Sequence, residues 1–235
     1  MKKNTMMRLA SVLLIAVLMS TCAISGTFAK YVTSETGTDS ARVAKFGVEV
    51  SATGYLFAKT YVNFANGNVP GTADMTISSS TDEDVLAPGS KSNDDGMVIS
   101  ITGTPEVDVA VTHDATINLT GWNYVDESSV SHFYCPLVFT IDGTVIDGSN
   151  YYDNYTLFVN ALTEAIETQS AEYDVNTNLA LQAANSVQIS WVWPYETTIG
   201  SKNCDVMDTY LGDQAADGTP AKVEITITTT VTQID

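Results

Sequence analysis

Residues 106–112, Glu-Val-Asp-Val-Ala-Val-Thr, have a valine at every second position. Successive side chains of a β-strand point to opposite faces of the sheet, so Val107, Val109 and Val111 share one face. The pattern predicts a half-buried strand. A second alternating run covers 221–234, where the residues on one face are Val223, Ile225, Ile227, Thr229 and Val231.

Much of the remaining chain consists of short runs rich in Val, Ile, Thr, Tyr and Phe, separated by Gly, Asn, Asp and Pro, which is typical of strands joined by turns. Further strands are expected at 44–50, 55–64, 75–78, 97–102, 115–120, 132–141, 144–146 and 186–193. Pro136 requires an edge position or a bulge within its run. Asp142-Gly143 is a hairpin turn signal, and the acidic stretch 81–96 is expected to be a loop.

One segment differs in kind. In 153–169 the apolar residues recur at helical spacing, which predicts an amphipathic helix of about four turns. Many short strands with one inserted helix predict an all-β fold, a jelly-roll-like two-sheet β-sandwich formed by a single domain at 43–235.

The N-terminus has the anatomy of a secretory signal peptide. Basic residues precede the apolar run Leu9–Met19, and small residues follow it at Thr27-Phe28-Ala29. We expect a signal peptide at 1–29, with cleavage around Thr27, Ala29 and Lys30, and a flexible N-terminal segment at 30–42. The protein is therefore expected to be secreted, with membrane contact only through the signal peptide before cleavage.

The chain is strongly acidic. Its formal charge is −18, and removal of residues 1–29 takes away Lys2, Lys3 and Arg8 but no acid, giving −21. Such a surface repels nucleic acid and anionic lipid, because phosphate binding depends on clustered Lys and Arg. Nucleic acid is therefore not an expected partner.

Catalytic patterns are missing from the sequence. It contains neither His-Glu-x-x-His nor Gly-x-Ser-x-Gly. His113 is expected in a turn between two strands, and His132 and Cys135 are expected on opposite faces of one strand, which disfavours a Cys–His dyad. We therefore expect no enzyme. Cys135 and Cys204 are either a disulfide pair or two separate thiols.

Two groups of residues are candidate binding sites. Asp82, Asp84, Asp94 and Asp95 could converge on Ca²⁺ through their oxygens, although their spacing matches no EF-hand and such acids usually form a solvated face. No other cofactor is expected.

The second group contains aromatic rings. Trp191 and Trp193 either fill the interior of the sandwich or, in the alternative interpretation, lie exposed and stack on a sugar. Asp205 and Asp208 have the spacing of a helix cap and first turn, and are expected to cap a short turn.

Two parts of the sequence resemble the TasA/camelysin group, Gram-positive secreted proteins processed by the signal peptidase SipW. Gly26–Ala52 resembles the signal-peptide junction of that group: Gly26-Thr27-Phe28-Ala29, then Tyr31, a polar stretch and a first strand. Lys30 departs from the pattern. Trp-Val-Trp-Pro at 191–194, followed by Asp-Val-Met-Asp-Thr-Tyr-Leu-Gly at 205–212, resembles a second motif of the group.

The resemblance implies a sandwich fold and a biofilm matrix fibre protein whose partners are copies of itself or related secreted fibre proteins, besides a SipW-type peptidase. A free, β-capable segment that includes Tyr31, Val32, Thr33 and Ser34 could pair with the sheet edge of a neighbouring subunit. Two alternatives remain: a cell-surface module that binds glycan or Ca²⁺, and an extracellular metalloprotease, which the resemblance to camelysin suggests and the sequence motifs do not.

Overall fold

The computed structural model describes residues 41–61, 76–92, 96–182, 186–199 and 202–234. The chain divides into two units, Met1–Val43 and Ala44–Asp235. In the first unit the described residues, 41–43, are exposed and outside any helix or strand. The expected cleavage residues Thr27, Ala29 and Lys30, and the segment Tyr31 to Ser34, lie outside the described residues. No helix in the described ranges is long and apolar enough to cross a membrane.

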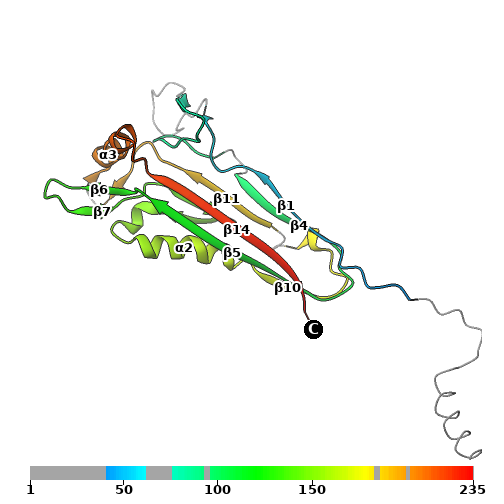
Figure 1. Cartoon of the computed structure of the whole chain (residues 1–235). Coiled ribbons are helices and arrows are strands. Elements are labelled where there is room, and N and C mark those ends of the chain that lie inside the picture. The colour runs from blue at the N-terminus through cyan, green and yellow to red at the C-terminus, as the bar shows by residue number, and fades with distance from the viewer. Residues whose placement is uncertain (1–40, 62–75, 93–95, 183–185, 200–201, 235) are drawn as a thin grey trace, which may run out of the picture. The chain divides into compact units, whose positions relative to one another are not determined.

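The second unit is built mainly from antiparallel β-sheets (Figure 1). The larger sheet has five strands in the order β1-β4-β11-β8-β9. These strands are β1 (Val48–Gly54), β4 (Met97–Gly103), β11 (Ser186–Val192), β8 (Val138–Ile141) and β9 (Thr144–Asp147).

The smaller sheet has three strands in the order β10-β5-β14. They are β10 (Ala171–Tyr173), β5 (Val109–Thr120) and β14 (Lys222–Gln233). Strands β5 and β14 pair over their full length, from Lys222 opposite Thr120 to Gln233 opposite Val109. Three two-stranded pairs complete the described strands: β2 (Thr60–Tyr61) with β3 (Ile77–Ser78), β6 (Asn123–Val125) with β7 (Ser131–Phe133), and β12 (Thr198–Ile199) with β13 (Lys202–Asn203).

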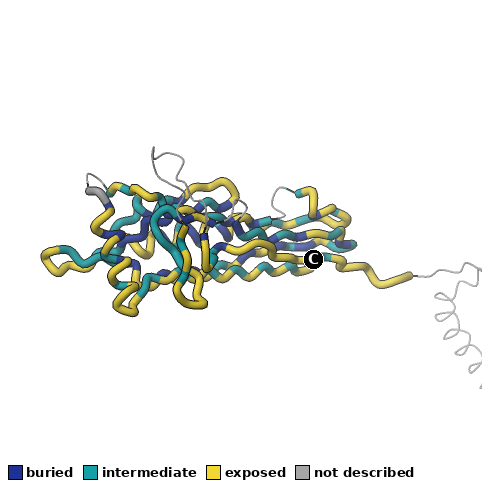
Figure 2. Tube along the Cα trace, turned by 90° about the horizontal axis from the view of Figure 1, so that it is seen from above, coloured by how far each residue is buried: buried dark blue, intermediate teal, exposed yellow. Residues whose placement is uncertain are grey.

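The two larger sheets face each other across apolar side chains. At one end Ile101 of β4 packs with Val109 and Val111 of β5 and with Leu179 of the 3₁₀ helix η2 (Leu179–Leu181). A larger buried cluster joins β5, β8, β11 and the helices, and Figure 2 shows these buried residues along the interior of the unit. Val109 and Val111, which the sequence pattern predicts on one face of a strand, therefore point inward.

Helix α2 (Tyr155–Glu167) confirms the helix expected at 153–169. It follows the 3₁₀ helix η1 (Gly148–Tyr151). Its buried residues are Phe158, Leu162 and Ile166, which recur every four residues and so lie on one face of the helix. The helix packs against β5 of the smaller sheet and against β8 and β9 of the larger one. It therefore closes one side of the space between the sheets.

The strand boundaries expected around His113 are wrong. The sequence predicts two strands with His113 in a turn between them, whereas β5 continues through this residue. His113 is 1% exposed, and its ring Nδ1 lies 2.9 Å from Oγ1 of Thr229 on β14. The polar ring takes an inward position because the facing threonine satisfies one of its nitrogens, and the unbroken ladder to β14 holds the backbone straight.

The run 132–141 is split where Pro136 predicts a disturbance. Strand β7 ends at Phe133 and β8 begins at Val138, and the buried residues between them belong to no strand. Proline has no N–H to donate to a ladder, which ends the pairing there. The turn expected at Asp142-Gly143 is confirmed, since both residues have positive φ, 45° and 81°, as a two-residue hairpin loop requires.

Three other boundaries differ from expectation. The first strand begins at Val48 rather than at residue 44. Within the described part of 55–64 only Thr60–Tyr61 is a strand. A second α-helix, α3 (Asp205–Ala216), stands where only a short turn was expected. Its weak amphipathic pattern, with Met207, Asp208 and Leu211 buried, gives little helical periodicity for a sequence to show.

The packing of α2 supplies a test of the core. Phe158 is fully buried and its ring centroid lies 5.3 Å from that of Tyr151 and 6.2 Å from that of Phe139. Phe158→Ala should lower the free energy of unfolding by about 3–5 kcal/mol, because it removes a large apolar group and leaves a cavity. Urea unfolding followed by circular dichroism measures the change.

The neighbouring Leu157 is the matched control. It is 57% exposed, so Leu157→Ala should change the free energy of unfolding by less than about 0.5 kcal/mol. Equal losses for the two variants would show that α2 does not bury the face described.

Candidate functional site: an open seam between the two sheets

Strand β14 is the edge of the smaller sheet. One side of it pairs with β5 over twelve residues, and no strand in the described ranges pairs with the other side (Figure 1). A free edge of this length presents a row of backbone N–H and C=O groups, which form the template for an added strand. Bulges and prolines are the usual protection of such edges, and Lys222–Gln233 contains no proline.

Strand β1 is the corresponding edge of the larger sheet, and its inward face is uncovered. Val50 lies opposite Ile101 and Ala52 opposite Ile99 in the ladder with β4. Directly opposed residues point to the same face of a sheet, so Val50 and Ala52 face inward, as the two isoleucines do. Yet Ile101 is 1% exposed whereas Val50 is 42% exposed and Ala52 is also exposed. The inward face of the sheet is therefore covered at β4 and uncovered at β1.

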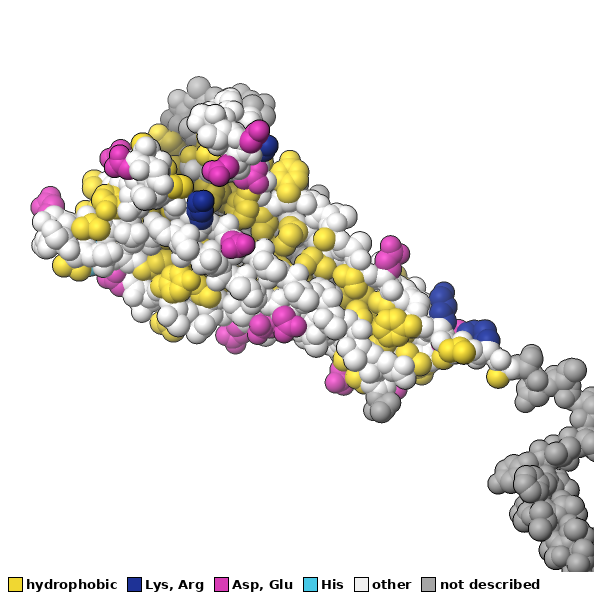
Figure 3. Space-filling model, viewed as in Figure 1, with side chains coloured by type: hydrophobic (Ala, Val, Ile, Leu, Met, Phe, Trp, Pro, Cys, Tyr) yellow, Lys and Arg dark blue, Asp and Glu magenta, His cyan; other side chains and the backbone are white. Residues whose placement is uncertain are grey.

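The inward face of β14 is likewise only half-buried, in contrast to that of β5. Val109, Val111, Ile117 and Leu119 of β5 are all buried. The apolar residues on the same face of β14 are only half-buried: Val223, Ile225, Ile227 and Val231. The space-filling view shows hydrophobic side chains running as a band along this side of the second unit (Figure 3).

The inward face of β1 and the edge strand β14 border the same opening between the two sheets. Val48 of β1 and Val231 of β14 both pack against the buried cluster of Ile101, Val109 and Val111. We call the unpaired edge of β14, together with the inward face of β1 (Val48, Val50 and Ala52), the open seam. On the other side of the sheets helix α2 covers β5, β8 and β9. The two sides therefore differ: a helix closes one, and the other has an unpaired backbone and partly exposed apolar side chains.

The tryptophans expected either in the interior or on a sugar-binding surface are buried. Trp122, Trp191 and Trp193 are 3%, 2% and 4% exposed. The indole N–H of Trp191 donates to the carbonyl of Leu56 at 2.7 Å, and the Trp122 and Trp193 ring centroids lie 5.5 Å apart. None of the three lies exposed on the outer surface, as the sugar-stacking alternative requires, whereas a role in filling the interior fits their burial.

Asp205 and Asp208 lie in the first turn of α3, but the N-cap residue, Cys204, makes no side-chain cap hydrogen bond. Asp208 instead accepts a hydrogen bond of 2.5 Å from the hydroxyl of Tyr134, across the interior. Burial raises the pKa of Asp208 to about 6, while the Tyr134 hydroxyl and the Trp193 indole act to lower it. Asp208 therefore makes a buried contact that ties α3 to the segment between β7 and β8, in place of the expected cap hydrogen bond.

Cys135 and Cys204 are both buried free thiols. Burial raises the pKa of each thiol, so neither has the thiolate character of a nucleophile. Of the two alternatives left open by the sequence, the structure has the separate thiols.

Of the four calcium candidates, the structure describes only Asp82 and Asp84. Asp82 is exposed and lies 3.2 Å from Nζ of Lys59, and Asp84 lies two residues further along the same loop. Asp94 and Asp95 lie outside the described residues. In the described ranges no three His, Cys, Asp or Glu side chains are arranged to hold a metal ion.

His132 makes a contact that sequence spacing does not reveal. Its Nδ1 lies 2.9 Å from the carboxylate of Asp153, which precedes α2, and its Nε2 lies 3.4 Å from Asp126. The hydrogen bond to Asp153 acts most strongly to raise the pKa of His132. The three residues are separated by six and twenty-one positions, so no local pattern could have grouped them. They fasten the β6–β7 hairpin to the start of α2.

No protein-family model, curated protein or solved structure matches this chain.

The buried carboxyl of Asp208 generates a pH prediction. Its pKa is about 6 in the folded protein, above its ordinary value of 3.8, so the folded state binds more protons than the unfolded state between these values. The associated stability is present below about pH 4 and is lost as the pH rises through 6. Asp208→Asn cannot ionise, so its free energy of unfolding relative to wild type should rise by up to about 3 kcal/mol from pH 4 to pH 7.

Urea unfolding at a series of pH values measures this difference. Tyr134→Phe removes a hydrogen bond that lowers the pKa of Asp208, so it should move the loss of stability to higher pH. Parallel pH curves for wild type and Asp208→Asn would contradict the assignment of a buried, proton-binding carboxyl.

Proposed function

We propose that this is a secreted, non-enzymatic structural protein that assembles into extracellular fibres by strand donation. In this proposal the segment at 30–42, freed by cleavage of the signal peptide, adds to the open seam of a neighbouring copy. The β-rich unit is then a jelly-roll-like sandwich that lacks one strand beside β14, and the donated segment occupies that position. The observation that carries the proposal is the twelve-residue unpaired edge of β14 beside the uncovered inward face of β1.

Length supports the match between donor and acceptor. A strand rises about 3.3 Å per residue, so the twelve residues of β14 extend over about 40 Å. The thirteen residues of 30–42 have the same reach when extended. Backbone hydrogen bonds to β14 would supply the affinity, and apolar side chains of the donor, such as Tyr31 or Val32, would cover Val50 and Ala52.

The geometry of donation favours a fibre over a closed oligomer. The donor and the acceptor are different parts of the chain, so each subunit offers one of each and the contact is heterologous. Contacts of this kind continue indefinitely unless the rotation between subunits closes a ring. The acidic surface works against close packing of subunits, so assembly should accelerate as salt screens the charge.

The test compares two substitutions on adjacent residues of β1. Val50→Glu places a charge on the inward face that the donor would cover, whereas Ser51→Glu places the same charge on the opposite face of the strand. Both positions are exposed in the single subunit, so both variants should fold. With the chain beginning at Lys30, Ser51→Glu should form fibres as wild type does and Val50→Glu should form at least tenfold fewer.

Sedimentation and electron microscopy measure the fibres, and deletion of Lys30–Ser40 should abolish them. Equal assembly of the two variants would show that the inward face of β1 is not covered. A wild-type chain that stays monomeric at every concentration and salt level would refute the proposal as a whole.

A further inference from the structure

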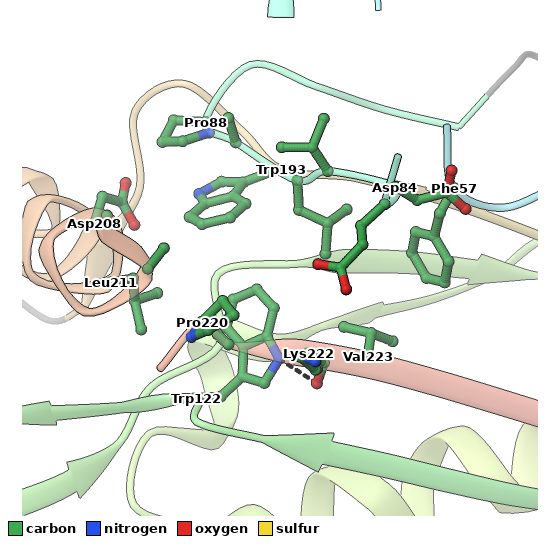
Figure 4. A pocket seen from close by; sticks show the side chains of 17 residues that line it. Phe57, Asp84, Pro88, Trp122, Trp193, Asp208, Leu211, Pro220, Lys222 and Val223 are labelled. Atoms are coloured by element: carbon green, nitrogen blue, oxygen red, sulfur yellow. Dashed lines mark hydrogen bonds between the residues drawn. The ribbon is translucent and has the colours of Figure 1, made fainter. Parts of the chain in front are cut away.

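A cavity of about 420 Å³ lies at the end of the second unit where α3, the loop 83–88 and the start of β14 meet. This volume is typical of a small-molecule site. Its walls are mainly apolar and include Phe57, Trp122, Trp193, Leu211 and Val223. Figure 4 shows the lining side chains Trp193 and Trp122 between Asp208 on one side and Asp84 on the other.

The charged side chains that line the cavity are predominantly acidic. They are Glu83, Asp84 and Asp208, against a single basic residue, Lys222. The surrounding protein adds to this negative potential, since the whole chain carries a formal charge of −18. An anionic ligand is therefore repelled both locally and at long range, and a cationic one is attracted.

Asp208 is the strongest indication of the charge of the ligand. It is 9% exposed and meets the hydroxyl of Tyr134, but no Lys, Arg or His in the described ranges forms an ion pair with it. A buried carboxylate without a cationic partner is costly, and a ligand that brings a positive charge compensates that cost. The apolar and aromatic walls suit a cation with an apolar body, because aromatic faces attract organic ammonium groups.

We propose that this cavity binds a small organic ammonium compound, with its charge directed to the carboxylates and its apolar groups against the aromatic walls. The cavity shares only the start of β14, Lys222 and Val223, with the open seam used in the proposed assembly. It requires no metal and no covalent step.

Three isosteres that differ in charge provide the test: choline, 3,3-dimethylbutan-1-ol and 3,3-dimethylbutanoate. Isothermal titration calorimetry on the chain beginning at Lys30 should give an affinity for choline at least tenfold above that for the neutral alcohol, and no binding of the carboxylate. Equal binding of choline and the alcohol would overturn the proposal, and so would the absence of saturable choline binding.

Charge-removing variants locate the interaction. The double variant Glu83→Gln/Asp84→Asn should weaken choline binding at least fivefold. Asp82→Asn is the matched control, because Asp82 adjoins these residues in the loop but does not line the cavity. If Asp82→Asn weakened choline binding as much as the double variant, choline would be responding only to the overall charge of the loop, and the assignment of the site would be wrong.

The indole N–H signals give an independent readout, since the chain has three tryptophans. In the Val50→Glu chain, choline should shift the NMR signals of Trp122 and Trp193 and leave that of Trp191, which does not line the cavity, in place. Equal shifts of all three would contradict the site. Failure of fibre assembly would leave these results unchanged, so the two proposals are refuted separately.

Discussion

The ladder between β5 and β14 is the interaction on which the rest of the second unit depends. Twelve residue pairs fix the register of the two longest strands, and a shift by one residue would turn every inward side chain outward. That register places Val109, Val111, Ile117 and Leu119 in the interior and His113 opposite Thr229. The larger sheet and helix α2 then pack on the face that this ladder defines.

The same ladder creates the open seam. A strand in a sheet has two edges, and the long pairing with β5 satisfies only one edge of β14. The larger sheet extends beyond β14 as far as β1, where Val48 packs against the buried cluster but Val50 and Ala52 stay exposed. Both the unpaired backbone and the exposed Val50 therefore follow from one fact, that the smaller sheet has fewer strands than the larger sheet it faces. A strand added to β14 would satisfy both.

Much of the fold could be predicted from local patterns. The alternation in 106–112 and 221–234, the helical spacing in 153–169 and the turn at Asp142-Gly143 each have a short-range physical cause. Each predicted element was found, although β5 begins at Val109, so residues 106–108 lie outside any strand. Failures occurred where a distant partner decides the outcome. His113 looks like a turn residue until Thr229, 116 positions away, supplies its hydrogen bond. Helix α3 buries an acidic residue against Tyr134, so its sequence lacks a clear apolar stripe.

The candidate sites, like the fold, could be predicted only where a local feature of the sequence marks them. The proposed donor segment could be suggested from the sequence, because the pattern that predicts a signal peptide followed by a polar segment is local. Its acceptor could not, since an unpaired edge is defined by strand order. The tryptophans were correctly expected to fill the interior as one of two alternatives. The cavity beside them joins a loop, a helix and the start of a strand that lie far apart in the chain, and no local motif reveals it.

Hydrogen–deuterium exchange of the chain beginning at Lys30, measured before and after assembly, tests the central claim most directly. Strand donation to the open seam predicts that amides of residues 222–233 whose N–H groups face the free edge become protected in the fibre, while the edge of β10 remains as it was in the monomer. Fibres in which exchange along β14 is unchanged, or in which protection appears only along the outer edge of β1, would contradict the account.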